Sequence, residues 1–216
     1  MSARRGIPFV VSAPSGTGKT TVCRRAVDAD PGLCFSISHT TRHRRAGETD
    51  GVDYHFVTEH EFQQLVDEAA FLEWAVYNDH RYGTSFAAVE GPLSEGRDVL
   101  LEIEIQGARQ VRTRRKDARC IFLLPPSFAV LRQRLEARGT DDPAVIARRL
   151  ELARQEFRAL AEFDYAVINA ELDETVSDLL AIVRAERARA TAAVRERFSP
   201  AAAAARFGTE AAESVA

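Results

Sequence analysis

Lysine is nearly absent from this chain of 216 residues. Lysine and arginine together number 29, yet only Lys19 and Lys116 are lysines. Arginine therefore carries almost every positive charge, and a position that keeps lysine is expected to need a compact ammonium group rather than a planar guanidinium. Lys19 is the more informative of the two, because it lies inside a glycine-rich string.

Other scarcities exclude whole classes of protein. The three cysteines, Cys23, Cys34 and Cys120, show no CxxC spacing, which is typical of reduced thiols in the cytoplasm and not of a disulfide framework. The apolar run at residues 7–11 is too short for a signal peptide core, and no run could span a membrane. A net charge of −3 argues against general binding to nucleic acid or anionic lipid. We expect a globular cytoplasmic protein.

Short apolar runs alternate with helical stretches along much of the chain. The runs are residues 7–13, 98–103, 119–124 and 165–169, and the first is followed by a predicted helix at 20–29. Strands that alternate with helices in this way predict an α/β fold with a doubly wound parallel sheet.

Three further helices show recognisable beginnings. Thr58 with Glu61 forms a capping box, Ser127 can cap the next helix, and Asp142 is followed by proline at the first helical position.

The pattern changes between residues 36 and 90, where short polar strands and arginines replace the long apolar runs. We predict an inserted small α/β domain there, within a core domain of residues 1–35 and 91–187 that carries a helical lid at about 134–150. The alanine-rich segment 188–216 is predicted to be a helix that passes into a disordered tail.

Residues 13–20 read APSGTGKT, the phosphate-loop pattern with alanine in place of its first glycine. The string follows a predicted strand and opens a predicted helix, which is the context the pattern requires. Backbone N–H groups of such a loop surround phosphate oxygens, and the helix N-terminus favours their charge. Lys19 would bridge the β and γ phosphates of ATP, and the Thr20 hydroxyl would bind Mg²⁺.

The phosphate loop alone does not distinguish a GTPase, a motor ATPase or a small-molecule kinase. Neither an NKxD nor a DxxG string occurs in the chain, which argues against a GTPase. Glu102 and Glu104 end the apolar run LLEIEIQG, and strand alternation predicts that both face one side. One of the two carboxylates could hold Mg²⁺ through water and the other could reach a substrate; we predict Glu102 for the metal.

Residues 38–54 read SHTTRHRRAGETDGVDY, and this string resembles the acceptor-binding segment SxTTRxxRxGExxGxxY of the guanylate kinase family. The resemblance continues in unbroken order through FLEWA, YGT, LEIEIQG, LPPS, RLEARGT and VIN, and covers about residues 7–187. It implies ATP-dependent phosphorylation of GMP, and of dGMP, in purine nucleotide metabolism, with Mg²⁺ as cofactor.

The resemblance also implies roles for individual residues. The GMP phosphate would be held by Ser38, Arg42, Arg45, Tyr54 and Tyr82, and the base would be read by Glu73 and Thr84. Glu102 and Glu104 would complete the GMP site, although the family more often has aspartate at the latter position. Residues that would bind ATP are Ala13, Pro14, Ser15, Gly16, Thr17, Gly18, Lys19, Thr20, Thr21, Arg138 and Asn169. Catalysis would fall to Lys19, Arg42, Arg134 and Arg149, of which the last two belong to the lid.

Two alternatives remain at this point. The chain could phosphorylate another nucleoside monophosphate or a sugar phosphate, or it could be a non-catalytic guanylate-kinase-like interaction module. The complete GTGKT string argues against the second, because such modules typically lack an intact phosphate loop. The oligomeric state is left open.

Overall fold

The structure is a computed structural model that describes residues 4–77, 79–137 and 142–189. The chain divides into two compact units, residues 1–181 and 182–216, and the fold and the site described below belong to the first. Two predictions fall outside the described residues: the role of Arg138, and the state of the tail from residue 190 onward.

A five-stranded parallel sheet forms the centre of the first unit, in the order β2-β7-β1-β8-β9. Its strands are β1 (Pro8–Ser12), β2 (Leu33–Phe35), β7 (Asp98–Glu102), β8 (Arg119–Leu124) and β9 (Tyr165–Ile168). The residues of β1 are all buried, as expected for a strand covered on both faces. The predicted parallel sheet is confirmed, although the three-residue strand β2 was not foreseen.

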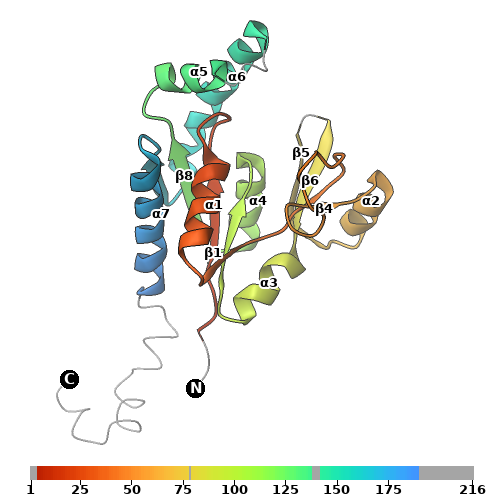
Figure 1. The fold of residues 1–216 in the computed structure, drawn as a ribbon. Helices are drawn as coiled ribbons and strands as arrows, with labels where there is room; N and C mark the ends of the chain where they lie inside the picture. The colour runs from red at the N-terminus through yellow and green to blue at the C-terminus, as the bar shows by residue number, and fades with distance from the viewer. Residues whose placement is uncertain (1–3, 78, 138–141, 190–216) are drawn as a thin grey trace, which may run out of the picture. The chain divides into compact units, whose positions relative to one another are not determined.

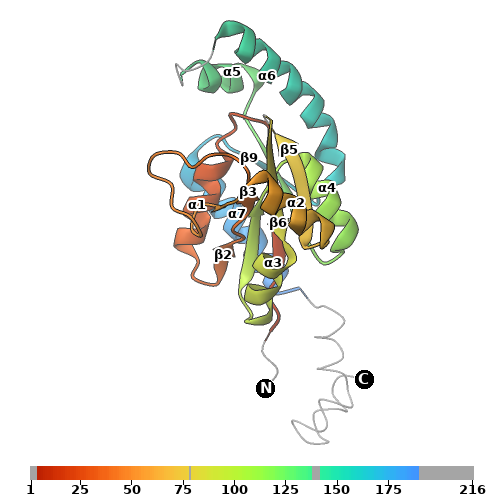
Figure 2. The same ribbon diagram turned by 90° about the vertical axis from the view of Figure 1, so that its right-hand side faces the viewer.

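Helices cover both faces of this sheet. These are α1 (Lys19–Ala29), α3 (Phe86–Ser94) and α4 (Ile105–Arg114). A further helix, α7 (Leu172–Arg187), follows β9 and begins in the first unit. Helix α1 packs on β1, β2 and β7, whereas α3 packs on β7 and α4 on β1. Figure 2 shows α1 and α4 on opposite sides of the strands. Among the described helices, none is at once long and apolar enough to cross a bilayer.

A second sheet of four strands has the order β4-β3-β6-β5. Its strands are β3 (His39–Thr40), β4 (His55–Phe56), β5 (Phe71–Tyr77) and β6 (His80–Ser85). Helix α2 (Glu59–Asp67) begins at the predicted capping box of Thr58 and Glu61. All of these elements lie between residues 36 and 90, the segment for which an inserted domain is predicted.

Helix α4 of the core holds the edge of this second sheet. The Gln110 amide donates to the Trp74 carbonyl at 2.7 Å, and its oxygen accepts from the Trp74 N–H at 3.3 Å. Arg114 donates to the carbonyls of Phe71 and Leu72 at 2.8 and 2.6 Å. The edge strand β5 thus finds partners for its unpaired backbone groups in side chains of a helix, not in another strand.

Two helices, α5 (Phe128–Glu136) and α6 (Pro143–Glu156), form a layer of their own at the top of Figure 1, followed by the 3-10 helix η1 (Phe157–Glu162). Both predicted caps are present: Ser127 accepts from the Val130 N–H and Asp142 from the Ala144 N–H. A small apolar core holds the pair together and consists of Leu131, Leu135, Ile146, Leu150 and Ala153.

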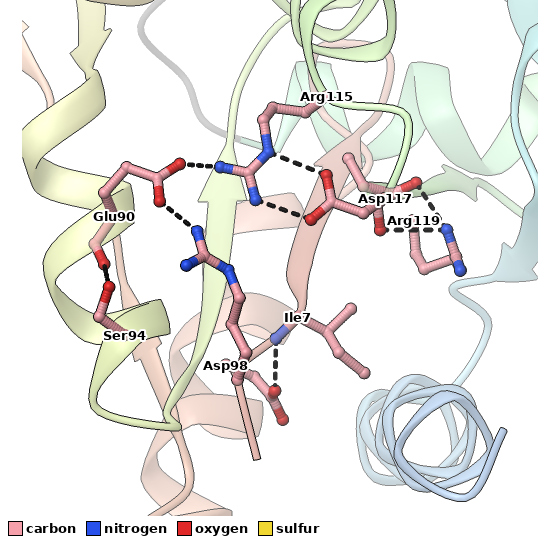
Figure 3. A network of polar contacts seen from close by, with 9 residues as sticks. Ile7, Glu90, Ser94, Asp98, Arg115, Asp117 and Arg119 are labelled. Carbon is pink, nitrogen blue, oxygen red and sulfur yellow. Dashed lines mark hydrogen bonds and ion pairs between the residues drawn. The ribbon is translucent and has the colours of Figure 1, made fainter. Parts of the chain in front are cut away.

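Polar side chains fasten α3, α4 and the chain's beginning together, away from the loop that follows β1 (Figure 3). Arg115, the C-cap residue that follows α4, binds both Glu90 of α3 and the carboxylate of Asp117. Nearby, the fully buried Asp98 accepts from the Ile7 N–H at 2.8 Å and from Arg4 at 2.7 Å. Asp98 therefore anchors the residues that lead into β1.

Replacement of Asp98 by alanine is expected to lower the free energy of unfolding by about 1–3 kcal/mol, because the Ile7 N–H loses its acceptor in a partly buried place. Urea denaturation would measure the change. Glu151→Ala is a matched control, since Glu151 forms an exposed ion pair with Arg154; its effect should stay within about 0.5 kcal/mol. Equal losses in the two variants would contradict the anchoring role.

Candidate active site

The glycine-rich loop between β1 and α1 has the backbone conformation of a phosphate cradle. The Thr17 N–H closes a turn onto the Pro14 carbonyl at 3.1 Å. Gly18, just before α1, has φ of +96°, and a Cβ there would lie 2.8 Å from the amide nitrogen of Asn169. Only glycine meets both demands without strain. The N-terminus of α1, with its unpaired N–H groups, opens beside this loop.

Lys19 and Thr20 are each bound to a carboxylate. The Lys19 ammonium donates to the Ile103 carbonyl and to Glu104, both at 3.0 Å, and the Thr20 hydroxyl donates to Glu102. Burial acts to lower the pKa of Lys19, but the charges of Glu104 and Glu102 outweigh it and raise the pKa above its usual value. Lys19 is therefore a stable cation in this site.

The prediction that strand alternation places Glu102 and Glu104 on one side was wrong. Strand β7 ends at Glu102, and Glu104 is the residue that precedes α4. The two carboxylates do not share a strand face. They meet the same loop because the chain turns from strand to helix between them.

A buried chain of hydroxyl and carboxyl groups lies in the second sheet. Thr84 donates to Glu73 at 2.6 Å and lies 3.0 Å from the Ser38 hydroxyl. The register of β5 against β6 shifts between Phe71 and Glu73, and the shift sets Glu73 opposite Thr84. The carboxyl of Glu73 also packs closely against Gly107 of α4, because a Cβ at that position would lie 2.4 Å from its Oε2. A side chain larger than hydrogen at position 107 would displace this carboxyl.

Glu73 is only 4% exposed. Burial raises the pKa of this carboxyl to about 7, against the opposing hydrogen bonds from Thr84. A carboxyl with such a pKa is half ionised at neutral pH, so a ligand that supplies hydrogen-bond donors would favour its charged form.

Two arginines and two tyrosines line the same cavity as the phosphate loop. Arg42 lies beside Tyr54, with its Cζ 5.5 Å from the ring centroid, and Tyr54 meets Tyr82 edge to face at 6.0 Å. Arg45 is exposed and lines the same cavity. This is a cluster of planar guanidinium and phenol donors that suits an anion.

Arg134, which is predicted to belong to the lid, and Asn169 contact the loop, but neither lines the cavity. Arg134 donates to the carbonyls of Thr17 and Asn169 at 3.1 and 2.9 Å, and the Asn169 amide donates to Thr17 at 2.6 Å. Arg149 lies on α6 and is half-buried. Arg134 and Asn169 therefore stabilise the phosphate loop through hydrogen bonds to the Thr17 carbonyl.

A single cavity of about 450 Å³ joins these groups. The predicted site residues that line it are Ala13, Pro14, Ser15, Gly16, Thr17, Gly18, Lys19, Thr20, Thr21, Ser38, Arg42, Arg45, Tyr54, Glu73, Tyr82, Glu102 and Glu104. Among the described candidates, Thr84, Arg134, Arg149 and Asn169 do not line it.

The cavity also has residues that sequence reasoning gave no role, among them Arg24, Glu48, Asp53 and Gly107. Glu48 and Gly107 stand inside the strings GE and QG that carried the resemblance, so only their place in those strings could have pointed to them.

Comparisons with known proteins agree with this geometry. The family model described as guanylate kinase matches residues 5–186. A guanylate kinase of Syntrophotalea carbinolica is 50% identical over 188 residues, which cover 87% of this chain and 90% of that protein. A guanylate kinase of Neisseria gonorrhoeae is also 50% identical, with 87% and 92% covered.

This chain belongs to the guanylate kinase family. The crystal structure of the guanylate kinase from Anaplasma phagocytophilum has the same fold, with a TM-score of 0.76, 30% identity, and coverage of 96% of this chain and 98% of that one. Membership of the guanylate kinase family makes the protein a nucleoside monophosphate kinase that acts on GMP, a phosphotransferase.

The raised pKa of Glu73 predicts a distinct pH dependence of stability. The folded state binds a proton at Glu73 between pH 4.5 and about 7 that the unfolded state has released. This group's contribution to stability therefore falls as pH rises through that window, by about 3 kcal/mol in all. A glutamine at position 73 cannot ionise, so the stability of Glu73→Gln relative to wild type should rise by that amount from pH 4.5 to 8.

Denaturant titrations of both proteins at several pH values would measure this difference. Glu68→Gln, at an exposed position, is the control for the general effect of replacing a carboxylate by an amide. A pH-independent difference for Glu73→Gln would contradict a buried, protonated Glu73.

Proposed function

We propose that this protein transfers the γ-phosphoryl group of ATP to the phosphate of GMP in the 450 Å³ cavity, giving ADP and GDP. The observation that carries the proposal is the joining of two unlike sites in one cavity. A phosphate cradle and a buried carboxyl, that of Glu73, both line it. We also propose residues 36–90 as the GMP-binding domain, and the cytoplasm, where ATP is available and thiols stay reduced, as the location.

The loop of residues 13–21 would bind the ATP phosphates, with Lys19 between the β and γ oxygens. The oxygen ligands near Thr20 suit Mg²⁺, because the Thr20 hydroxyl and the Glu102 carboxylate already lie within a hydrogen bond of each other and are the hard ligands this ion prefers. Thr20 would bind the ion directly and Glu102 through water, and Mg²⁺ would neutralise charge on the transferring phosphate. Arg138 is proposed beside the ATP and Arg149 beside the phosphoryl group.

The part of the cavity at Glu73 suits guanine. Guanine offers N1–H and N2–H donors to Glu73 and an O6 acceptor to Thr84. The Thr84 hydroxyl has one hydrogen, which it donates to Glu73 in the empty site, so it would turn from Glu73 towards the base when guanine binds. Adenine offers a bare N1 acceptor, which would face the Glu73 carboxylate and leave it unpaired. Because guanine requires the ionised form of Glu73, the KM for GMP should fall as pH rises through 7.

The phosphate of GMP would lie among Ser38, Arg42, Arg45, Tyr54 and Tyr82. It is an anion at neutral pH and can attack without a general base, so the side chains act by positioning and by neutralising charge. Lys19 and the arginines supply that neutralisation. Glu104, which holds Lys19 here at 3.0 Å, would release it when nucleotide enters.

A comparison of monophosphates tests the specificity. With ATP and Mg²⁺, formation of ADP should be rapid with GMP and dGMP, and kcat/KM should be at least about 10³-fold lower with AMP and UMP, because a site built around hydrogen bonds discriminates strongly. A coupled assay of ADP measures all four. Equal turnover of AMP and GMP would refute the role of Glu73, and binding of GMP without turnover would favour an interaction module.

Substitution of Lys19 by arginine tests the phosphate loop. The charge is conserved, but a guanidinium is too broad to reach between the phosphates, so kcat should fall by about 10²- to 10³-fold. Lys116→Arg is the matched control, because Lys116 is exposed and outside the cavity, and it should leave kcat and KM unchanged. Full activity of Lys19→Arg would contradict the proposed role.

A further inference from the structure

Glu48 holds Arg42 by both terminal nitrogens. Arg42 Nη2 donates to Glu48 Oε1 at 2.8 Å, and Nη1 donates to Oε2 at 3.1 Å. The Arg45 backbone N–H donates to the same Oε2 at 2.8 Å. Both side chains are largely buried, with exposed fractions of 10% for Arg42 and 20% for Glu48. One carboxylate thus connects the two arginines proposed to bind the GMP phosphate.

The bonds to Arg42 occupy one end of its guanidinium group. Nη1 donates to Glu48 and to the His43 carbonyl at 2.7 Å, and Nη2 uses one N–H for Glu48. Of the five N–H groups of an arginine, the bonds to Glu48 and His43 leave the one on Nε and the second on Nη2. These two share the other edge of the group and form the parallel fork that a phosphate accepts. The Tyr82 side chain, which is also proposed to bind the phosphate, is a further hydrogen-bond partner of this guanidinium.

Two aromatic rings lie beside the same guanidinium. Its Cζ lies 5.5 Å from the centroid of Tyr54 and 5.7 Å from that of Phe56. These rings attract the cation but offer no directional acceptor, so they do not select which of its edges faces the cavity. The two bonds to Glu48, together with the bond to the His43 carbonyl, therefore decide which edge of Arg42 is left for a ligand.

We propose that Glu48 is a positioning residue of this enzyme, which binds Arg42 end-on so that the side edge of its guanidinium is ready for the phosphate of GMP. Glu48 acts through Arg42 and does not touch the substrate. The inference rests on the proposed function, since it assumes that Arg42 binds that phosphate. The hydrogen bond raises the pKa of Arg42 and lowers that of Glu48, so both stay charged at neutral pH.

Two other roles for the contact between Glu48 and Arg42 predict different effects of removing Glu48 on ligand affinity. If Glu48 only occupied the phosphate position in the empty cavity, its removal would free Arg42 and strengthen GMP binding. If Glu48 only stabilised the segment around it, its removal would weaken the binding of every ligand of the second sheet, whether or not that ligand carries a phosphate.

Binding of GMP and of guanosine to Glu48→Ala and Glu48→Gln separates these roles, because guanosine lacks the phosphate. Calorimetric titration should show GMP affinity lower by about 10- to 100-fold in Glu48→Ala, as for loss of charged hydrogen bonds, and guanosine affinity unchanged within about twofold. Glu48→Gln keeps one acceptor and the shape, and should fall between. In kinetics, the KM for GMP should rise while the KM for ATP stays constant.

Glu59→Gln is the matched control. Glu59 of α2 pairs with Arg81 of β6 at 3.3 Å, and neither residue lines the cavity. This variant should leave GMP affinity unchanged. Tighter GMP binding by Glu48→Ala, or equal losses for GMP and guanosine, would overturn the proposal. If Glu48→Ala does not fold, Glu48→Gln decides alone by the same comparison. Absence of GMP binding by the wild-type protein would instead refute the proposed function.

Discussion

The contact between α4 and the edge strand β5 is the interaction on which the site depends. Gln110 and Arg114 satisfy backbone groups of β5 that no strand pairs. Because α4 begins directly after Glu104 and has Gly107 in its first turn, this one helix links the carboxylate at the phosphate loop to the carboxyl of Glu73. A change in how α4 meets β5 would alter the distance between the two halves of the cavity.

Two cationic side chains of the cavity, Lys19 and Arg42, are each paired with a carboxylate in the empty site. Glu104 neutralises Lys19 and Glu48 neutralises Arg42, so neither cation is buried alone, which would be costly. The two pairs differ in their geometry. Lysine presents a point charge that can change partners, whereas arginine can hold a carboxylate by one edge and still offer another. The scarcity of lysine in the chain makes its presence in the loop informative for this reason.

Local patterns allowed the elements of the core to be predicted closely. The phosphate loop, the caps at Thr58, Ser127 and Asp142, and the strand of residues 119–124 depend on interactions within a few residues, and the structure has each of them. Strand β2 was missed because three residues carry too little periodicity. The alternation argument for Glu102 and Glu104 failed because it assumed a strand that continued past its end.

Long-range contacts account for what the sequence could not supply. The sequence by itself determined the α/β class, the phosphate loop, the family and most side chains that line the cavity. Each of these depends on local spacing or on strings that match the family. Only the tertiary structure decided that the register of β5 sets Glu73 against Thr84, that Gly107 makes room for that carboxyl, and that Glu48 grips Arg42 end-on. These contacts depend on how strands pair and how a helix meets a sheet edge, which involves residues far apart in the chain and leaves no periodic pattern in the sequence.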